Sequence, residues 1–292
     1  MLIRIIEIVF PVFAIVVIGV IYGRLRAPDM QMANQVNLHV FIPCLVFTAL
    51  IQQPLSAVAD GGLILAALLM HVVPAILVIP VIRLSGHAVK TLLPPAVFAN
   101  AGNLGLPLFV LAFGQAALAP AVVLFLVMNI LQFTVGVRFL DREIHWHRVV
   151  MHPLVVAAIL GISYQLIGVD LSSAWIMPVE MLGQVAVPLM LFTLGTALIH
   201  TGFPAWRLGL WYGLTVPVVG VAAAILIIQV LPLGDLQQRM LILYGALPPA
   251  VMTYIFAQRY NQEPDKVATI VMIGNMLAVL VIPATLFFIL SL

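Results

Sequence analysis

The sequence predicts an all-α membrane protein in which ten transmembrane helices form two inverted five-helix repeats. Three observations lead to this prediction: an extreme apolar composition, long apolar runs separated by short polar joints, and proline motifs that recur in both halves. Of the 292 residues, 64% are hydrophobic and 8% are charged, and the mean hydropathy is +1.23. A soluble globular domain would carry far more charge, so we expect the chain to be solvated by lipid.

The apolar runs have the length that a bilayer requires, because about 20 helical residues cross its hydrocarbon core. The predicted spans are residues 5–23, 36–53, 62–82, 92–113, 118–138, 150–168, 175–199, 208–231, 241–259 and 267–290. Arg24 and Arg26 follow the first run without a small-residue cleavage pattern, which favours a retained helix over a signal peptide. These spans leave no room for an extramembrane domain of ordinary size.

The distribution of basic residues predicts the orientation. Arg4 and Arg239 fall on one face, and ten basic residues fall on the other: Arg24, Arg26, Arg83, Lys90, Arg138, Arg142, Arg148, Arg207, Arg259 and Lys266. By the positive-inside rule the face with ten charges is cytoplasmic. We therefore expect an integral protein of the cytoplasmic (inner) membrane with both termini outside, or periplasmic.

The two halves of the chain resemble each other. Residues 94–97 and 248–251 both read Pro-Pro-Ala-Val. Further counterparts are Pro11, Gly19 and Tyr22 with Pro153, Gly161 and Tyr164, Pro43 with Pro188, and Asn129 with Asn275. The predicted repeats are residues 1–140 and 141–292. Because each repeat has five spans, an odd number, the second enters from the opposite face and the repeats are inverted.

The recurring prolines lie inside the fourth and ninth spans, where a helix break exposed to lipid would be costly. We expect Pro94, Pro95, Pro107, Pro248 and Pro249 to interrupt these two helices. If the interrupted helices cross at the membrane midplane, two half-helix N-termini meet there. Such ends carry unsatisfied N–H groups and partial positive charge, which suits an anion.

The fourth span also carries the strongest candidate binding residues. Asn100 and Asn103 are three residues apart, so they share a helix face, and their amides can orient a carboxylate. Gly102 and Gly105 permit close backbone approach. The remaining candidates for the pocket are Pro248, Pro249, Thr253, Tyr254, Asn129 and Asn275. Helix packing is the alternative interpretation, because small residues and amides are common at helix interfaces in membranes.

The segment from Asn100 to Pro107 with Leu108, together with residues 247–261, resembles the auxin efflux carrier family, and the resemblance extends over essentially the whole chain. It implies a ten-helix crossover fold similar to the bile-acid sodium symporters. Helices 1, 2, 6 and 7 would form a scaffold domain, and helices 3–5 and 8–10 a moving transport domain. It also implies a homodimer assembled through the scaffold helices and transport of small organic anions.

The chain departs from the plant members of that family in two ways, one that removes their kinase-regulated region and one that affects the expected substrate. Only about a dozen residues, from Arg138 to Val149, stand where plant members have a long hydrophilic loop. Pro249 stands where their motif usually has a polar residue. A plant hormone is therefore not the default substrate, and the chain resembles bacterial carriers of malonate or malate type as well as the plant exporters.

Titratable residues within the spans limit how transport could be coupled to an ion gradient. His71 near the middle of the third span could exchange a proton, although a lone buried histidine is more often a packing residue. Glu180 near the outer end of the seventh span is the other candidate, and His39 is weaker. Proton coupling, sodium coupling and uniport all remain open at this stage.

Other functional classes find little support. His145, His147 and His152 lack the spacing of a metal site, Cys44 has no disulfide partner, and no cofactor motif is present. There is no basic run for nucleic acid and no clustered catalytic set, so we expect no enzyme. The expected function is elevator-type transport of a small organic anion by a secondary carrier. A membrane-embedded sensor that binds a ligand without moving it is the alternative.

Overall fold

A computed structural model describes residues 2–52, 60–140, 150–168, 171–199 and 204–291. Its helices are α1 (Leu2–Arg26), α2 (Gln31–Val36), η1 (Asn37–Phe41), α3 (Ile42–Ile51), α5 (Gly61–Leu84), α6 (Val89–Val97), η2 (Ala101–Gly105), α7 (Leu106–Phe113), η3 (Gln115–Ala117), α8 (Leu118–Leu131), η4 (Gln132–Gly136), α9 (Val137–Leu140), α11 (Pro153–Ile167), α12 (Ser173–Ala197), α13 (Trp206–Val230), α14 (Asp235–Gly245), α15 (Val251–Arg259) and α16 (Pro264–Ser291). The segments η1, η2 and η4 are π-helical, and η3 is a 3₁₀ turn.

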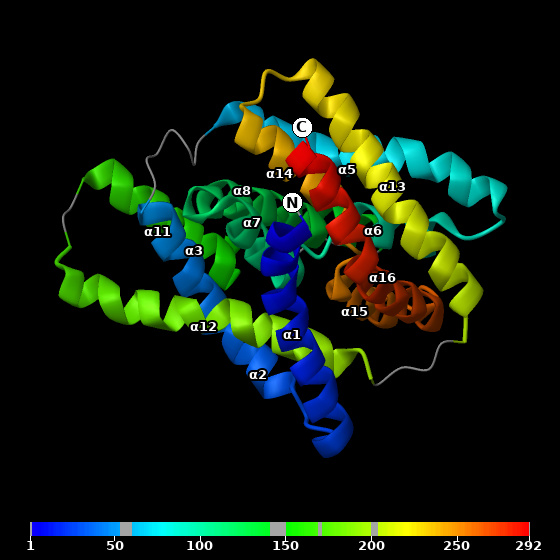
Figure 1. Cartoon of the computed structure of the whole chain (residues 1–292), viewed down its shortest axis with the longest axis horizontal. Helices are drawn as coiled ribbons and strands as arrows, with labels where there is room; N and C mark the ends of the chain where they lie inside the picture. The colour runs from blue at the N-terminus through cyan, green and yellow to red at the C-terminus, as the bar shows by residue number, and fades with distance from the viewer. Residues whose placement is uncertain (1, 53–59, 141–149, 169–170, 200–203, 292) are drawn as a thin grey trace.

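The described residues form an all-α fold with no strand, as the composition predicts (Figure 1). Seven helical segments within this part are long and apolar enough to cross a membrane: residues 3–26, 31–51, 61–84, 115–140, 173–197, 206–230 and 264–291. They correspond to seven of the ten predicted spans. The predicted span 150–168 forms the shorter helix α11, and spans 92–113 and 241–259 are each divided into two pieces.

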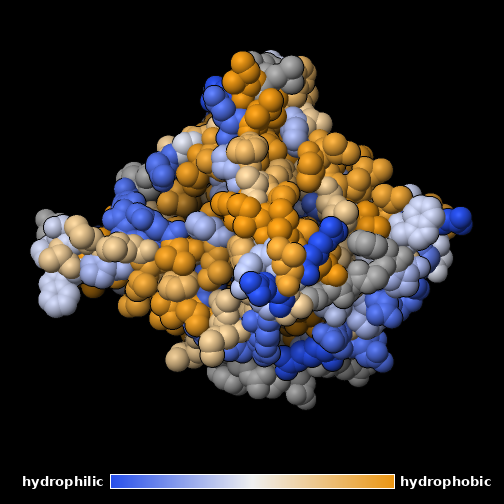
Figure 2. Space-filling view, turned by 60° about the horizontal axis from the view of Figure 1, so that its bottom comes forward, coloured by the Kyte–Doolittle hydropathy of each residue, from blue (hydrophilic) through white to orange (hydrophobic). Residues whose placement is uncertain are grey.

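The surface of the protein is largely apolar, as expected of helices in contact with lipid. Figure 2 shows apolar side chains over broad parts of the visible face. Phe10 and Ile18 of α1, and Val218 and Val230 of α13, are each more than half exposed. The long helices are thus apolar on their outer faces as well as toward the core, and the protein is an integral membrane protein.

The helices pack in two groups. In the first, α1 lies against α12, and α3 lies against α11 and α12. In the second, α13 lies against α5, α14 and α16, and α5 lies against α6. Glycine permits the closest crossings: a Cβ at Gly195 of α12 would overlap the backbone of α1. The helices α7 and α8 touch both groups: α7 lies against α1 and α14, and α8 lies against α3 and α5.

The N-terminus of α5 is capped by an acidic side chain. Asp60 Oδ1 accepts hydrogen bonds from Gly62 N (2.8 Å) and Leu63 N (3.1 Å), and Asp60 Oδ2 accepts one from Gln237 Nε2 of α14 (2.6 Å). The Gln237 bond, followed by the two backbone bonds, lowers the pKa of Asp60 against the opposing effect of burial. The carboxylate therefore ties the start of α5 to the start of α14.

Replacing Asp60 with Ala is expected to destabilise the protein by about 1 kcal/mol, because two backbone N–H groups and Gln237 lose their acceptor. Thermal unfolding of the purified protein, followed by tryptophan fluorescence, measures the loss. Asp60→Asn is the matched control, since an amide oxygen still caps the helix. An Asp60→Ala protein as stable as the wild type at neutral pH would show that this cap contributes nothing.

A second polar contact joins the start of α6 to the loop before α16. Thr91 Oγ1 donates to Glu263 Oε2 (2.7 Å), and Lys266 pairs with the other carboxylate oxygen. The Lys266 bond first, then the Thr91 bond, lowers the pKa of Glu263 from its ordinary value of 4.5. A lowered pKa in the folded state means that the ionised carboxylate adds stability above pH 4.5, and that this stability is lost as the pH falls through the lower, folded-state value.

Glu263→Gln is accordingly expected to lower the free energy of unfolding at neutral pH by less than about 1 kcal/mol, because the side chain is largely solvated. The melting temperature should fall slightly. The difference from wild type should disappear at acidic pH, where the wild-type carboxylate is also neutral. Melting curves of both proteins over a pH series test this. A difference that persists unchanged into acid would contradict the electrostatic explanation.

Candidate functional site

Two helix breaks are associated with the repeated proline motif: the first follows the motif at Val97, and the second contains Pro248 and Pro249. The helix α6 ends at Val97, Phe98 is extended (φ −98°, ψ 102°), and helical structure resumes at Ala101. The helix α14 ends at Gly245, Ala250 is extended (φ −67°, ψ 137°), and α15 begins at Val251. Each predicted span is therefore interrupted by a short non-helical segment.

The two breaks bind each other through their backbones. Ala99 and Pro249 form an isolated antiparallel bridge. Asn100 N donates to Pro248 O (2.7 Å), and Ala250 N donates to Phe98 O (2.9 Å). An interrupted helix leaves backbone groups without intrahelical partners, which is costly away from water. Each break supplies the partners that the other lacks.

A buried pair of asparagines, Asn100 in the first break and Asn275 in α16, links the junction to α16. Asn100 Nδ2 donates to Asn275 Oδ1 (2.8 Å), and Asn275 Nδ2 donates to the carbonyls of Pro249 (3.1 Å) and Val271 (2.8 Å). Asn100 is only 4% exposed. Because an amide nitrogen carries two hydrogens, one N–H of Asn100 remains available beside the junction.

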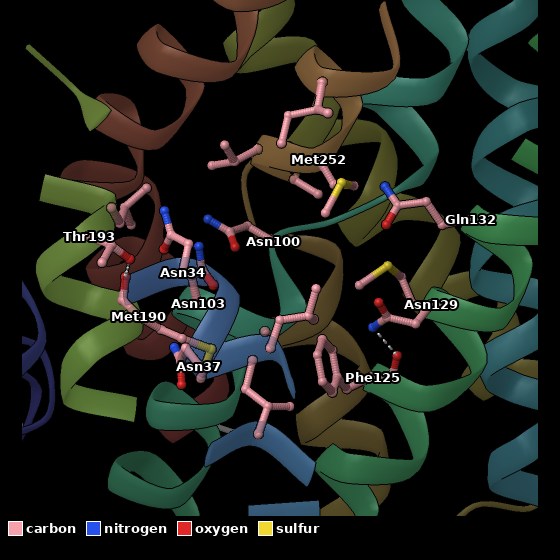
Figure 3. Close-up of a pocket in the computed structure, with 18 of the residues that line it drawn as sticks. Asn34, Asn37, Asn100, Asn103, Phe125, Asn129, Gln132, Met190, Thr193 and Met252 are labelled. Carbon is pink, nitrogen blue, oxygen red and sulfur yellow. Dashed lines mark hydrogen bonds between the residues drawn. The ribbon is translucent and has the colours of Figure 1, made fainter. Parts of the chain in front are cut away.

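A cavity of about 230 Å³ lies against the junction (Figure 3). Its lining residues are Asn34, Asn37, Leu38, Ile42, Ala99, Asn100, Gly102, Asn103, Phe125, Met128, Asn129, Gln132, Met190, Thr193, Leu194, Ala197, Ala250, Val251, Met252 and Ile255. None of these side chains is charged, and six are amides. Polar recognition in the cavity therefore relies on amides, one hydroxyl and the backbone.

Two helix N-termini contribute to the cavity wall. Gly102 and Asn103 are in the first turn after one break, and Val251 and Met252 are in the first turn after the other. Backbone N–H groups in a first turn have no intrahelical acceptor, and each helix N-terminus carries about half a positive charge. Gly102 is needed here because a Cβ would lie 2.8 Å from the ring of Phe125.

Several predicted residues lie at the junction without lining the cavity. Thr253 is buried and donates to Ala250 O (2.6 Å), which closes the first turn of α15. Pro248 and Pro249 lie in the second break, and a Cβ at Gly105 would lie 2.9 Å from Leu247. Tyr254 packs in a separate small cluster of apolar residues. Of the predicted set, Asn100, Gly102, Asn103 and Asn129 line the cavity itself.

The other predicted helix-breaking prolines lie inside helices. Pro94 and Pro95 are in α6, just before its break. Pro107 lies near the start of α7, within the continuous helical run of residues 101–113. Proline is tolerated at the first positions of a helix, and the π-helical turn η2 precedes it. Pro107 therefore occurs in a helix that is not interrupted at this point.

The two residues predicted as candidates for proton coupling are away from the cavity. His71 is buried behind the first break, where its Nδ1 lies 2.7 Å from Ala67 O and its Nε2 lies 3.4 Å from the Tyr244 hydroxyl. Since the carbonyl only accepts, Nδ1 carries the hydrogen. Glu180 lines a second cavity of about 420 Å³, together with Gln52, Gln115 and Gln184.

Sequence reasoning missed four polar residues of the first cavity: Asn34, Asn37, Gln132 and Thr193. Asn37 and Gln132 are 3% and 1% exposed, and each begins a π-helical segment. Asn37 Oδ1 and Gln132 Nε2 have no hydrogen-bond partner in the described part of the chain. A buried polar atom without a partner costs about 1–3 kcal/mol, and π-helical turns are frequent at functional sites.

One of the three histidines considered as a metal site caps a helix. His152 Nδ1 accepts a hydrogen bond from Leu154 N (3.4 Å) at the start of α11. His145 and His147 lie outside the described residues, as do Arg142 and Arg148. Within the described ranges, no group of three His, Cys, Asp or Glu side chains could hold a metal ion.

Comparison with known proteins agrees with a transport function. The family described as membrane transport protein matches residues 141–287, which is half of the chain. A protein of Rhizobium meliloti named "Putative malonate transporter" is 22% identical, with 97% of this chain and 95% of the relative aligned. An "Uncharacterized transporter" of Methanocaldococcus jannaschii is 23% identical, with 94% and 96% aligned. The chain therefore belongs to the membrane transport protein family, the auxin efflux carrier family that its motifs resemble.

Proposed function

We propose that this protein is a secondary carrier that moves a small organic anion across the cytoplasmic membrane. The observation that carries the proposal is the junction of the two helix breaks. Its backbone bonds join Phe98 to Ala250 and Asn100 to Pro248, and both following helices begin at one cavity. Interrupted helices whose N-termini face a common cavity are the usual device by which carriers bind an anionic group.

The electrostatics of the cavity favour a single negative charge. Two helix N-termini contribute about half a charge each, so together they offset one carboxylate. No lysine, arginine or histidine lines the cavity in the described structure, so a second negative charge would have no counter-charge. The remaining N–H of Asn100 and the amide of Asn103 would orient the carboxylate.

The crossover fold with inverted repeats is part of this proposal. Residues 1–140 and 141–292 would be the two repeats, with the interrupted segments as crossing helices 4 and 9. Arg4 and Leu290, near the two ends of the chain, line one surface hollow, which supports an even number of membrane crossings. The packing of α1, α3, α11 and α12 in one group supports their role as a scaffold domain, through which a homodimer would form.

Alternating access would follow from movement of the second helix group against this scaffold, in the manner of an elevator. Asn34 and Ile255 at the rim of the cavity are exposed, and Asn34 comes shortly after the last turn of α1, which contains Arg24 and Arg26. The cavity thus opens toward the face where most of the basic residues are expected. In this arrangement the site would face the cytoplasm, with both termini outside.

Transport by the purified protein in liposomes tests the proposal. Supported-membrane electrophysiology with malonate, malate, lactate and indole acids over a pH series reports the substrate, charge movement and proton dependence together. We expect a carboxylate to produce a current that protein-free liposomes lack. A protein that binds a carboxylate in detergent but never moves it would select the sensor function instead.

A further inference from the structure

The cavity wall formed by α8 and η4 carries two amides that the proposed carboxylate site does not use. Asn129 and Gln132 are three residues apart, so their Cβ atoms are neighbours at about 5–6 Å on a helix. Figure 3 shows both on the same side of the cavity, across from Asn103 and Thr193. A group of the substrate that lies away from the junction would therefore meet these two side chains.

Hydrogen bonding leaves one acceptor and one donor on this wall. Asn129 Nδ2 donates to Phe125 O (2.8 Å), which fixes the orientation of the amide and leaves Oδ1 as the acceptor. Gln132 is almost fully buried, and its Nε2 has no partner in the described structure. A hydroxyl placed between the two amides could donate to Asn129 Oδ1 and accept from Gln132 Nε2.

We infer that Asn129 and Gln132 form a specificity subsite for an uncharged substrate group that both donates and accepts a hydrogen bond. A hydroxyl and an un-ionised carboxyl have this chemistry. A second carboxylate does not, because it only accepts and none of the described residues that line the cavity is cationic. The inference rests on the proposed function, in which the first carboxylate binds at the junction.

Asn37 differs from Gln132 although both are buried amides at the start of a π-helical segment. Asn37 Nδ2 donates to Ala186 O of α12 (3.4 Å), so the donor of this amide is engaged with a neighbouring helix and only its acceptor, Oδ1, has no partner in the described structure. Asn37 therefore serves as a matched control: it lines the same cavity, but on the side of α12 rather than α8.

The hydroxyl is tested with lactate and propionate, which differ by that group and are both ionised at neutral pH. We expect wild-type protein in liposomes to have a KM for lactate about three- to tenfold lower than for propionate, the range of one or two hydrogen bonds. Gln132→Leu should bring the two KM values together while propionate is still transported, which shows that the variant is folded. Asn37→Leu should keep the wild-type ratio.

The un-ionised carboxyl is tested with malonate. If the subsite accepts an un-ionised carboxyl, wild-type transport of malonate should rise as the pH is lowered toward the pKa of its second carboxyl. The rise should follow the fraction of malonate that is present as the monoanion. In Gln132→Leu this rise should be about three- to tenfold smaller.

The outcomes separate the inference from the function on which it rests. Preference for lactate or for the malonate monoanion that is lost in Gln132→Leu but not in Asn37→Leu supports the subsite. Equal KM values for lactate and propionate together with pH-independent malonate transport would overturn the subsite and leave the carrier function intact. A preference that survives Gln132→Leu would also overturn it. Absence of transport for every carboxylate would contradict the carrier function itself.

Discussion

Replacing Asn100 with Ala is expected to reduce transport by about ten- to a hundredfold without unfolding the protein. The substitution removes the N–H proposed to contact the substrate, and a hydrogen bond to a charged group contributes about 1.5–3 kcal/mol. It also removes the 2.8 Å bond that holds Asn275. The backbone bonds between the breaks do not involve the side chain, so the junction itself should survive.

The measurement is initial uptake in liposomes, with melting temperature and size-exclusion profile as tests of folding. Asn275→Ala separates positioning from direct contact. It leaves the Asn100 amide in place but unsupported, so the effect should be smaller and should fall mainly on KM. Normal transport by Asn100→Ala would refute the proposed role of this residue. Equal losses in Asn100→Ala and Asn275→Ala would favour a structural role for the pair.

Replacing Gly220 with Val is expected to prevent accumulation of folded protein. Gly220 of α13 and Gly245 of α14 face each other so closely that a Cβ on either would overlap the backbone carbonyl oxygen of the other. Backbone cannot yield as a flexible side chain can, so the two helices would have to separate. Because α14 ends at Gly245, separation would also displace the second break.

Fluorescence-detected size exclusion of tagged protein in detergent measures this effect, and Gly245→Val should behave in the same way. Gly61→Ala is the control, because within the described residues a Cβ added at this helical position meets nothing within 4 Å beyond its chain neighbours and its own helix backbone. We expect the control to match the wild type or exceed it slightly, since Ala favours helix over Gly. A monodisperse Gly220→Val protein with wild-type melting temperature would contradict the packing argument.

Local sequence carries much of the fold because the membrane simplifies the pattern. A run such as residues 206–230 is apolar over a full bilayer length, and seven of the predicted spans form helices of that kind. The break at residues 246–250 is also a local property, since Pro248 and Pro249 lack the N–H groups that a helix needs. Pro107 shows the limit of this reasoning, because its effect depends on its position within the helical run.

The composition of the cavity could not be derived from local pattern. Asn34 and Asn37 come from one helical run, and Gln132 and Thr193 come from two others far away in the chain. Each resembles an ordinary polar residue of a helix interface. Glu180 and His71 stood out because they titrate, yet neither lines the cavity. Hydrophobic periodicity shows that a residue is near apolar neighbours, but it does not show which helices meet.

The sequence by itself determined that this is an all-helical membrane protein, where its apolar helices run, and that no helix continues through Pro248 and Pro249. Those properties follow from chain length, apolar content and the chemistry of proline, all of which act within a few residues. Only the tertiary structure decided that Ala99 pairs with Pro249 and that amides from separate helices surround one uncharged cavity. Contacts between residues 150 positions apart depend on how whole helix faces pack, and no single segment contains that information.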